Sequence, residues 1–208
     1  SVLIPTFGRP GYLYRTLRSL SAQVSPPGGV EVIVAIDGPD PATAETALGM
    51  TTPFRLIVVQ RERNGGRAAA CNSALAAARG ELVLFLDDDI CLEPGVLTAH
   101  VASHEETRDV ACLGLAYPRP PARPNAVDMW TRKRYEALVA RLVNEGRFRS
   151  PRDASTVNLS VSRRAAMDVG GFCEDFQFYG KEDVEFVYRL TKAGIELRLL
   201  PQAVLSHW

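Results

Sequence analysis

The most suggestive feature of the sequence is a run of three carboxylates, Asp87–Asp89, directly after the apolar residues Leu82–Leu86. Like charges this close repel one another, so a cation or several hydrogen-bond donors must offset them. Since side chains alternate along an extended chain, Asp87 and Asp89 can face one side while Asp88 faces the other. Hard oxygen ligands with open positions beside them suit Mg²⁺ or Mn²⁺ bridged to phosphate. The alternative is a loop whose aspartates cap the helix expected from Pro94.

A second acidic pair, Glu182 and Asp183, falls in the first turn of an amphipathic helix predicted over 182–193. The helix dipole favours acidic residues in this position, which alone explains them in many proteins. A carboxylate held ionised there can also act as a general base. It can remove the proton of an attacking hydroxyl group when the reaction has a good leaving group. Both interpretations stay open on this evidence.

Three further sites carry weaker signals. His207 follows an apolar strand, where a single histidine is more often structural than a ligand. Asp37 ends another strand and can accept a hydrogen bond from a base imide or a sugar hydroxyl, or simply form a turn. The segment Asn64–Arg67 opens a helix with two glycines, a weak phosphate signal that matches neither the P-loop nor the dinucleotide fingerprint. We expect Asn64 to cap that helix, and Arg67 can face a nucleotide.

The remaining histidines and the cysteines indicate no metal site. His100 and His104 lie four residues apart on one predicted helix, and we expect both on its surface. The four cysteines show no CxxC pair, so we expect buried free thiols in a reducing compartment; they are Cys71, Cys91, Cys112 and Cys173.

Apolar runs bounded by turn residues alternate with helical patterns, which predicts an α/β layer structure. The first four strands are rich in Val, Ile and Leu, as expected for parallel strands covered on both faces, so their carboxyl ends should form the binding edge. The predicted strands are 2–7, 31–37, 54–60, 82–88, 110–117, 156–162 and 197–205. The predicted helices are 12–23, 41–48, 67–79, 94–104, 131–144, 164–169 and 182–193.

Residues 117–152 break this alternation. Four prolines in 117–124 argue against a regular strand, and from Arg119 to Arg152 nine basic residues face three acidic ones. We predict a mobile loop that leads into a basic helix and separates a front half, 1–116, from a back half, 153–208, of one domain.

Composition excludes several classes of protein. The 208 residues hold 24 Lys+Arg and 24 Asp+Glu, so no net charge attracts a nucleic acid backbone. No apolar run is longer than five residues, far below the roughly 20 of a membrane span. The sequence starts at Ser1 without a charged leader, so we expect it to be a trimmed part of a longer chain. We expect this part to be cytoplasmic and to contain no membrane span. Flanking segments of the longer chain could associate with a membrane.

The order of these motifs resembles a family 2 glycosyltransferase of the GT-A fold. The match runs from Val2–Pro10 through the strand ending at Asp37, Asn64–Asn72 and the strand into Asp87–Asp89. The back half is similar to inverting galactosyl- and N-acetylgalactosaminyltransferases. Its matching segments are 158–164, 170–172, 180–186 with Arg189 and Leu190, and His207.

The resemblance implies a single Rossmann-like GT-A domain that binds a nucleotide-diphosphate sugar, most often a UDP-sugar, across the strand ends. Pro5 and Thr6 would lie beside the nucleotide, Asp37 would read the base, and Arg9 would contact the donor. Asp87–Asp89 would occupy the position of the metal-binding Asp-x-Asp motif, with Asp89 the first ligand and Asp88 in the variable middle position.

The same resemblance implies that His207 completes the metal shell and that Mn²⁺ or Mg²⁺ is the cofactor. Asp183 would be the general base and Glu182 would orient the hydroxyl group of a glycan, lipid-linked or small-molecule acceptor. Attack opposite the leaving group would then invert the anomeric carbon. The front half, 1–116, would bind the nucleotide sugar and the back half, 153–208, the acceptor, with Trp130 either stacked on a sugar face or packed into the core. A nucleotidyltransferase of related fold and a silent module that binds sugar nucleotides or glycans are the competing hypotheses.

Overall fold

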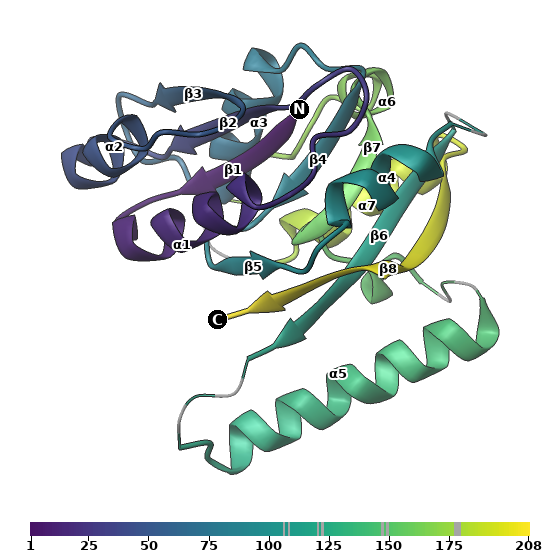
Figure 1. The fold of residues 1–208 in the computed structure, drawn as a ribbon. Coiled ribbons are helices and arrows are strands. Elements are labelled where there is room, and N and C mark those ends of the chain that lie inside the picture. Colours follow the sequence, from purple (N-terminus) through teal and green to yellow (C-terminus); the bar gives the residue numbers. More distant parts are fainter. Residues whose placement is uncertain are drawn as a thin grey trace.

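The computed structural model describes residues 1–105, 107, 109–119, 121, 123–146, 148, 150–176 and 180–208 (Figure 1). The strands are β1 (Val2–Thr6), β2 (Glu31–Ile36), β3 (Arg55–Gln60), β4 (Leu82–Leu86), β5 (Ile90–Leu92), β6 (Val110–Pro118), β7 (Asn158–Ser162) and β8 (Glu196–His207). The helices are α1 (Pro10–Ser21), α2 (Pro41–Leu48), α3 (Arg67–Ala77), α4 (Val96–Ser103), α5 (Ala126–Glu145), α6 (Arg163–Asp168) and α7 (Glu182–Lys192), with a 3₁₀ turn, η1 (Pro151–Asp153).

All eight of these strands form one sheet in the order β3-β2-β1-β4-β7-β6-β8-β5. Strands β1 to β4 are mutually parallel where they pair, and β6 runs parallel to β8, whereas β7 and β5 are antiparallel to their neighbours. The predicted α/β class with a mixed, mostly parallel sheet is therefore confirmed. The chain order reverses between β1 and β4, so the carboxyl ends of these strands form a crevice suited to a ligand.

Helices cover both faces of the sheet because alternate residues of each strand point to opposite faces. In β1, Leu3 packs toward α3 and α7, while Val2 and Ile4 pack toward α1 and α4. The same alternation recurs in β2, whose residues divide between the two hydrophobic clusters. Each face of the sheet thus has its own core.

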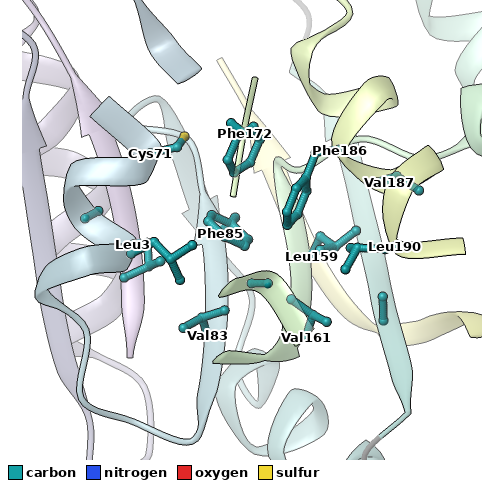
Figure 2. Packing of buried hydrophobic residues seen from close by; sticks show 14 of the residues in the cluster. Leu3, Cys71, Val83, Phe85, Leu159, Val161, Phe172, Phe186, Val187 and Leu190 are labelled. Carbon is teal, nitrogen blue, oxygen red and sulfur yellow. The ribbon is translucent and has the colours of Figure 1, made fainter. Parts of the chain in front are cut away.

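Three phenylalanines join the strand that precedes the acidic run to the helix that carries the second acidic pair (Figure 2). Phe85 of β4 makes edge contacts with Phe172 and with Phe186 of α7, at centroid distances of 5.2 and 5.6 Å. Phe172 and Phe186 stack at 4.3 Å. Phe85 lies two residues before Asp87 and Phe186 three after Asp183, so this buried cluster fixes one acidic motif relative to the other.

Several predicted boundaries are wrong. Strand β4 ends at Leu86 rather than Asp88, because the chain turns there into β5, a three-residue strand that only its antiparallel pairing with β8 defines. Strand β6 includes Pro118, the first of the prolines predicted to exclude a strand. Strand β8 extends to His207 through an irregularity that shifts the β6–β8 register between Gly114 and Leu115.

Helix boundaries also differ from the predictions, for reasons of capping. Helix α4 starts at Val96 after the left-handed Gly95, so the acidic run does not cap it. Helix α5 starts at Ala126, five residues earlier than predicted, because Asn125 and Asp128 form a capping box. Helix α3 takes Gly66 as its N-cap, and the predicted capping role of Asn64 is therefore wrong.

The predicted surface position of His100 and His104 is wrong as well. His100 is 1% exposed, with Nδ1 2.7 Å from the Ser160 hydroxyl and Nε2 2.9 Å from Asn158 Oδ1. The Asn158 side-chain NH₂ group donates to the carbonyl oxygens of Leu115 and Ala203, so Asn158 Oδ1 accepts a hydrogen bond from His100 Nε2. His104 Nε2 lies 2.9 Å from the same Ser160 hydroxyl. Two histidines on one helix thus anchor α4 to the middle of the sheet.

The cysteine prediction is partly correct. All four thiols are free; Cys71 and Cys112 are buried, whereas Cys91 and Cys173 are half-buried. None of the described helices combines the length and apolar character needed to cross a bilayer.

Burial of His100 makes folding sensitive to acid. Burial lowers the pKa of His100 to about 4 from its ordinary 6.5. Between these values the unfolded chain binds a proton that the folded protein excludes, so stability is lost as pH falls from 6.5 toward 4. The loss attributable to this side chain is on the order of 3 kcal/mol.

We predict that His100→Gln is less stable than the parent at pH 7.5 but loses less free energy of unfolding on acidification to pH 4.5. Urea unfolding of both proteins across this range measures the difference. Parallel pH profiles of the two proteins would contradict the prediction.

Candidate active site

A cavity of about 510 Å³ opens at the carboxyl ends of β1, β2 and β4. It contains every predicted substrate-binding and metal-binding residue except Trp130. The residues that line it are Pro5, Thr6, Phe7, Arg9, Asp37, Asn64, Gly66, Arg67, Ala70, Asp87, Asp88, Asp89 and His207. Glu182 and Asp183 do not line it, but Arg67 connects the cavity to them.

Asp87, Asp89 and His207 form the only group of potential metal ligands found among the described residues, with one ligand atom from each lying within 4.8 Å of the others. His207 Nε2 is 3.0 Å from Asp89 Oδ1 and 3.8 Å from Asp87 Oδ2. The pairing of β5 with β8 creates this arrangement, because it places His207 opposite Ile90, directly after the acidic run.

Asp88 faces away from this group, as strand alternation predicts. Its carboxylate accepts a 2.6 Å hydrogen bond from the Thr6 hydroxyl and lies 3.1 Å from Arg9 Nη1. The other terminal nitrogen of Arg9 binds Asp89. Burial raises the pKa of Asp88 to about 6, helped by the neighbouring aspartates and opposed by Thr6 and Arg9. Asp88 therefore ties the acidic run to β1 rather than to the metal-ligand group.

Arg67 links the two acidic motifs. Its Nη2 donates to Asp87 Oδ1 at 2.6 Å, and its Nη1 lies 3.6 Å from Glu182 Oε1. Glu182 is buried, and its other oxygen accepts from the Gly180 amide at 2.9 Å. The Nη1 atom of Arg67 is buried without a hydrogen-bond partner, which leaves a cationic donor available to a bound ligand.

Asp183 occupies the first turn of α7, as predicted, and is half-buried. One of its carboxylate oxygens accepts from the Val184 amide at 2.7 Å. Burial raises the pKa of Asp183, with a further contribution from the charges of Glu182 and Asp87. Lys181, just before the helix, has φ +79°; this left-handed conformation is uncommon for a residue with a side chain.

Asp37 is already bound to the loop that precedes α3. Its two oxygens accept from the amides of Gly65 and Gly66 at 3.0 and 2.7 Å, and Arg61 Nε lies 3.0 Å away. Sequence reasoning missed Arg61, although its place directly after β3, at the same edge of the sheet, was an available signal. The structure thus gives Asp37 a positioning role beside any contact with a base.

Thr16 is a second residue that the sequence did not indicate. It is fully buried on α1, where its hydroxyl donates to the carbonyl oxygen of Asp88 at 2.8 Å and accepts from the Ile90 amide at 3.1 Å. These bonds fix the turn between β4 and β5. A threonine inside the apolar stripe formed by Leu13, Leu17 and Leu20 was the signal that could have found it.

The charges in the site suit a divalent cation. Asp87, Asp88, Asp89 and Glu182 contribute four carboxylates. Within the described part of the chain, the cationic groups that pair with them are the guanidinium groups of Arg9 and Arg67 and the imidazole of His207. Asp89 Oδ1 is buried, and among the described residues only His207 Nε2 approaches it, at 3.0 Å. Carboxylate ligands suit Mg²⁺ and Mn²⁺, and an imidazole ligand favours a transition metal over Mg²⁺. The residues present therefore fit the metal expected from the sequence.

Trp130 lies outside the cavity. It projects from α5 with 57% of its surface exposed, and Arg134 stacks over its ring at 4.7 Å. The core-packing interpretation of Trp130 is therefore wrong, because the side of α5 that faces the sheet is formed by Val139 and Leu142. Its contact with a sugar stays a prediction.

The strand order and the cavity at the carboxyl ends of the parallel strands are those of a GT-A fold. Residues 1–165 match the glycosyl transferase family 2, and residues 141–206 match the family described as the N-terminal domain of galactosyltransferase. The chain therefore belongs to glycosyl transferase family 2, as its motifs predicted, and the nucleotidyltransferase hypothesis loses its support.

Among its relatives is the validoxylamine A glucosyltransferase of Streptomyces hygroscopicus subsp. limoneus, 30% identical over 220 residues that cover 95% of this chain and 49% of the relative. The chain thus spans about half the length of this relative. Staphylococcus aureus TarS 1-349 in complex with UDP superposes with a TM-score of 0.75 at 21% identity, over 99% of this chain and 59% of that one.

The mannosyltransferase PcManGT from Pyrobaculum calidifontis, in complex with GDP-Man and Mn²⁺, also gives a TM-score of 0.75 at 21% identity. The match covers 99% of this chain and 55% of the other. At this level of identity, the two structures establish the shared fold.

We predict that Asp89→Asn lowers the affinity for Mn²⁺ at least tenfold, while Asp88→Asn, the matched control, changes it much less. The reason is that Asp89 faces His207, whereas Asp88 faces Thr6 and Arg9. Titration of Mn²⁺ followed by electron paramagnetic resonance, with UDP present, measures both affinities. Equal losses in the two variants would be incompatible with this assignment.

Metal affinity should also depend on pH through His207. The hydrogen bond and charge of Asp89 raise the pKa of His207 above its ordinary 6.5, against the effect of burial. A proton competes with the metal for Nε2, so Mn²⁺ affinity should fall as pH is lowered through this raised pKa. The same titration on His207→Ala, which binds more weakly throughout, should show a shallower dependence.

Proposed function

We propose that the chain is the catalytic domain of a metal-dependent inverting glycosyltransferase that moves a hexose from a UDP-sugar to an acceptor hydroxyl group. One observation carries the proposal. Arg67 contacts both Asp87 of the candidate metal group and Glu182, the neighbour of Asp183. A donor-binding site and a candidate base are therefore held within one connected set of charged side chains.

The donor would lie along the cavity at the carboxyl ends of the parallel strands. Pro5 and Thr6 would flank the nucleotide, and Asp37 would accept a hydrogen bond from the base, with its loop held by Gly65 and Gly66. Structures of S. aureus TarS with UDP and with UDP-GlcNAc, and of GalNAc-T7 with UDP, GalNAc and Mn²⁺, support a uridine nucleotide. The GDP-Man complex of PcManGT shows that this fold also accommodates guanosine.

The charged residues would divide the chemical work. Asp87, Asp89 and His207 would hold Mn²⁺ or Mg²⁺, which when bound neutralises negative charge on the diphosphate leaving group. Arg67, whose Nη1 makes no hydrogen bond to any described residue, would donate one to the sugar nucleotide. Arg9 is committed to Asp88 and Asp89 and would act by holding the shape of the acidic run.

Asp183 would remove the proton from the attacking hydroxyl group. Its raised pKa makes it a stronger base than an ordinary aspartate. Glu182 would position Arg67 and the start of α7 and orient the acceptor hydroxyl. Attack from the side of α7, opposite the diphosphate, would invert the anomeric carbon. The acceptor would be a glycan, a lipid-linked sugar or a small molecule.

The activity itself can be tested with a panel of UDP- and GDP-sugars in the presence of Mn²⁺, scoring release of nucleoside diphosphate with and without EDTA. We expect release from at least one UDP-sugar, abolished by EDTA and restored by excess Mn²⁺. Tight nucleotide binding without release from any donor, in the presence of a broad acceptor mixture, would favour the silent binding module.

We predict that Asp183→Asn lowers kcat by a factor of roughly 10² to 10⁴ with little change in the affinity for UDP and Mn²⁺, because it removes only the base. Glu185→Gln is the matched control on the same helix; Glu185 pairs with Arg189 and should be dispensable. Nucleoside diphosphate release measures kcat, and calorimetry measures UDP affinity. An Asp183→Asn variant as active as the parent would contradict the mechanism.

The parent enzyme should lose kcat/KM in acid as Asp183 becomes protonated. The raised pKa of Asp183 places this loss above 3.8, the ordinary aspartate value. A pH profile of kcat/KM at saturating metal tests this. The inflection should be absent from the residual activity of Asp183→Asn.

A further inference from the structure

A short segment that follows α6 connects the helix that carries Arg67 to the helix that carries Asp183. We call residues 169–174 the bridge segment; it lies against the side chain of Asn72 on α3. Asn72 and residues 170–172 both fall in the stretches that match the family motifs. The mechanism proposed above gives neither of them a role.

Asn72 holds the bridge segment with three hydrogen bonds. Its side-chain oxygen accepts from the Phe172 backbone amide at 2.7 Å, and its side-chain nitrogen donates to the Phe172 carbonyl oxygen at 2.9 Å. The same nitrogen donates to Glu174 Oε1 at 2.8 Å. Because Phe172 is buried, its backbone groups need a partner within the protein, and Asn72 provides it for both.

Gly171 allows this close contact. It has φ +67°, in the left-handed region that favours glycine. A Cβ added here would lie 2.5 Å from Asn72 Oδ1, closer than two non-bonded atoms can approach. A side chain at position 171 would therefore displace Asn72 and separate the bridge segment from α3.

The bridge segment is also attached to α7, at two points. The ring of Phe172 stacks on that of Phe186, with the centroids 4.3 Å apart (Figure 2). The guanidinium group of Arg189 donates to the carbonyl oxygen of Val169. Phe172 is thus bound to α3 through its backbone and to α7 through its ring.

The two helices joined in this way carry the charged groups of the proposed mechanism. Arg67 begins α3, five residues before Asn72, and Asp183 lies in the first turn of α7, three residues before Phe186. Where the charged ends of the helices meet, Arg67 Nη1 approaches Glu182 at 3.6 Å, which is longer than a hydrogen bond. The spacing of these ends therefore depends on the buried contacts farther along each helix.

We propose that Asn72 is a positioning residue, which acts through the bridge segment to set the place of Asp183 relative to the sugar nucleotide bound beside Arg67. This inference rests on the proposed function, in which Asp183 is the base. Asn72 is not among the residues that line the cavity. Its loss should therefore impair the chemical step and spare nucleotide binding.

Asn72→Ala should lower kcat by a factor of about 10 to 100, because a displacement of about 1 Å between reacting groups has an effect of this order. The affinity for UDP and Mn²⁺ should not change. Nucleoside diphosphate release measures kcat, and calorimetry measures UDP affinity. His100→Gln is the matched control for lost stability, since it removes buried hydrogen bonds of α4, on the other face of the sheet; it should keep the kcat of the parent.

A second variant tests the contact from the opposite side. Gly171→Ala should lower kcat as Asn72→Ala does, because the added methyl group displaces the Asn72 side chain. In the Asn72→Ala background that obstacle is absent, and the methyl group would meet Leu75 Cδ2 at an ordinary 3.7 Å. The two substitutions together should then lower kcat far less than the product of their separate effects.

Hydrogen exchange tests the same link without turnover. In Asn72→Ala, the amides of the bridge segment and of the first turn of α7 should exchange faster, whereas those of β1 to β3 should exchange as in the parent. His100→Gln should leave exchange in the first turn of α7 unchanged.

The proposal is overturned if Asn72→Ala keeps the kcat of the parent, if its UDP affinity falls as much as its kcat, or if exchange in the first turn of α7 is unchanged. A loss of kcat shared by His100→Gln, or independent effects of the Asn72 and Gly171 variants, would overturn it as well. The proposed function fails separately, if the parent releases diphosphate from no nucleotide sugar, and the exchange experiment still decides whether Asn72 holds α7.

Discussion

The structure depends on the accumulation of negative charge at the end of a buried strand. Three consecutive aspartates beside an apolar core need hydrogen-bond donors or cations as partners, and each one has them. Asp87 pairs with Arg67, Asp88 with Thr6 and Arg9, and Asp89 with Arg9 and His207. These partners come from β1, the start of α1, the start of α3 and the end of β8, so the acidic run organises most of the elements around the cavity.

Long-range packing places the remaining functional groups. The pairing of β5 with β8 brings position 207 beside position 89, and Thr16 holds the turn that makes this pairing possible. On the other face of the sheet, Phe85, Phe172 and Phe186 fix α7 against β4, which brings Asp183 close to Arg67 and Asp87. The candidate metal group and the candidate base are thus both attached to β4.

Local sequence patterns were sufficient for the parallel half of the fold. Strands β1 to β4 are continuous apolar runs, and their ends carry the polar residues of the cavity, so Thr6, Asp37 and Asp87–Asp89 could be placed at one edge. The short strand β5 and the burial of His100 could not be predicted from local patterns. Each depends on a distant segment: β8 for β5, and Asn158 and Ser160 for His100. Trp130 illustrates the same limit, because only the packing of α5 decides which side of that helix is exposed.

The central claim is that one divalent cation joins Asp89 and His207 to the donor diphosphate. The most direct test is an anomalous difference map, recorded at the manganese absorption edge from crystals grown with UDP and Mn²⁺. The account predicts a single strong peak within coordinating distance of an Asp89 carboxylate oxygen, of His207 Nε2 and of the diphosphate. Bound UDP with no peak there, or with the metal coordinated by Asp88 instead, would contradict it.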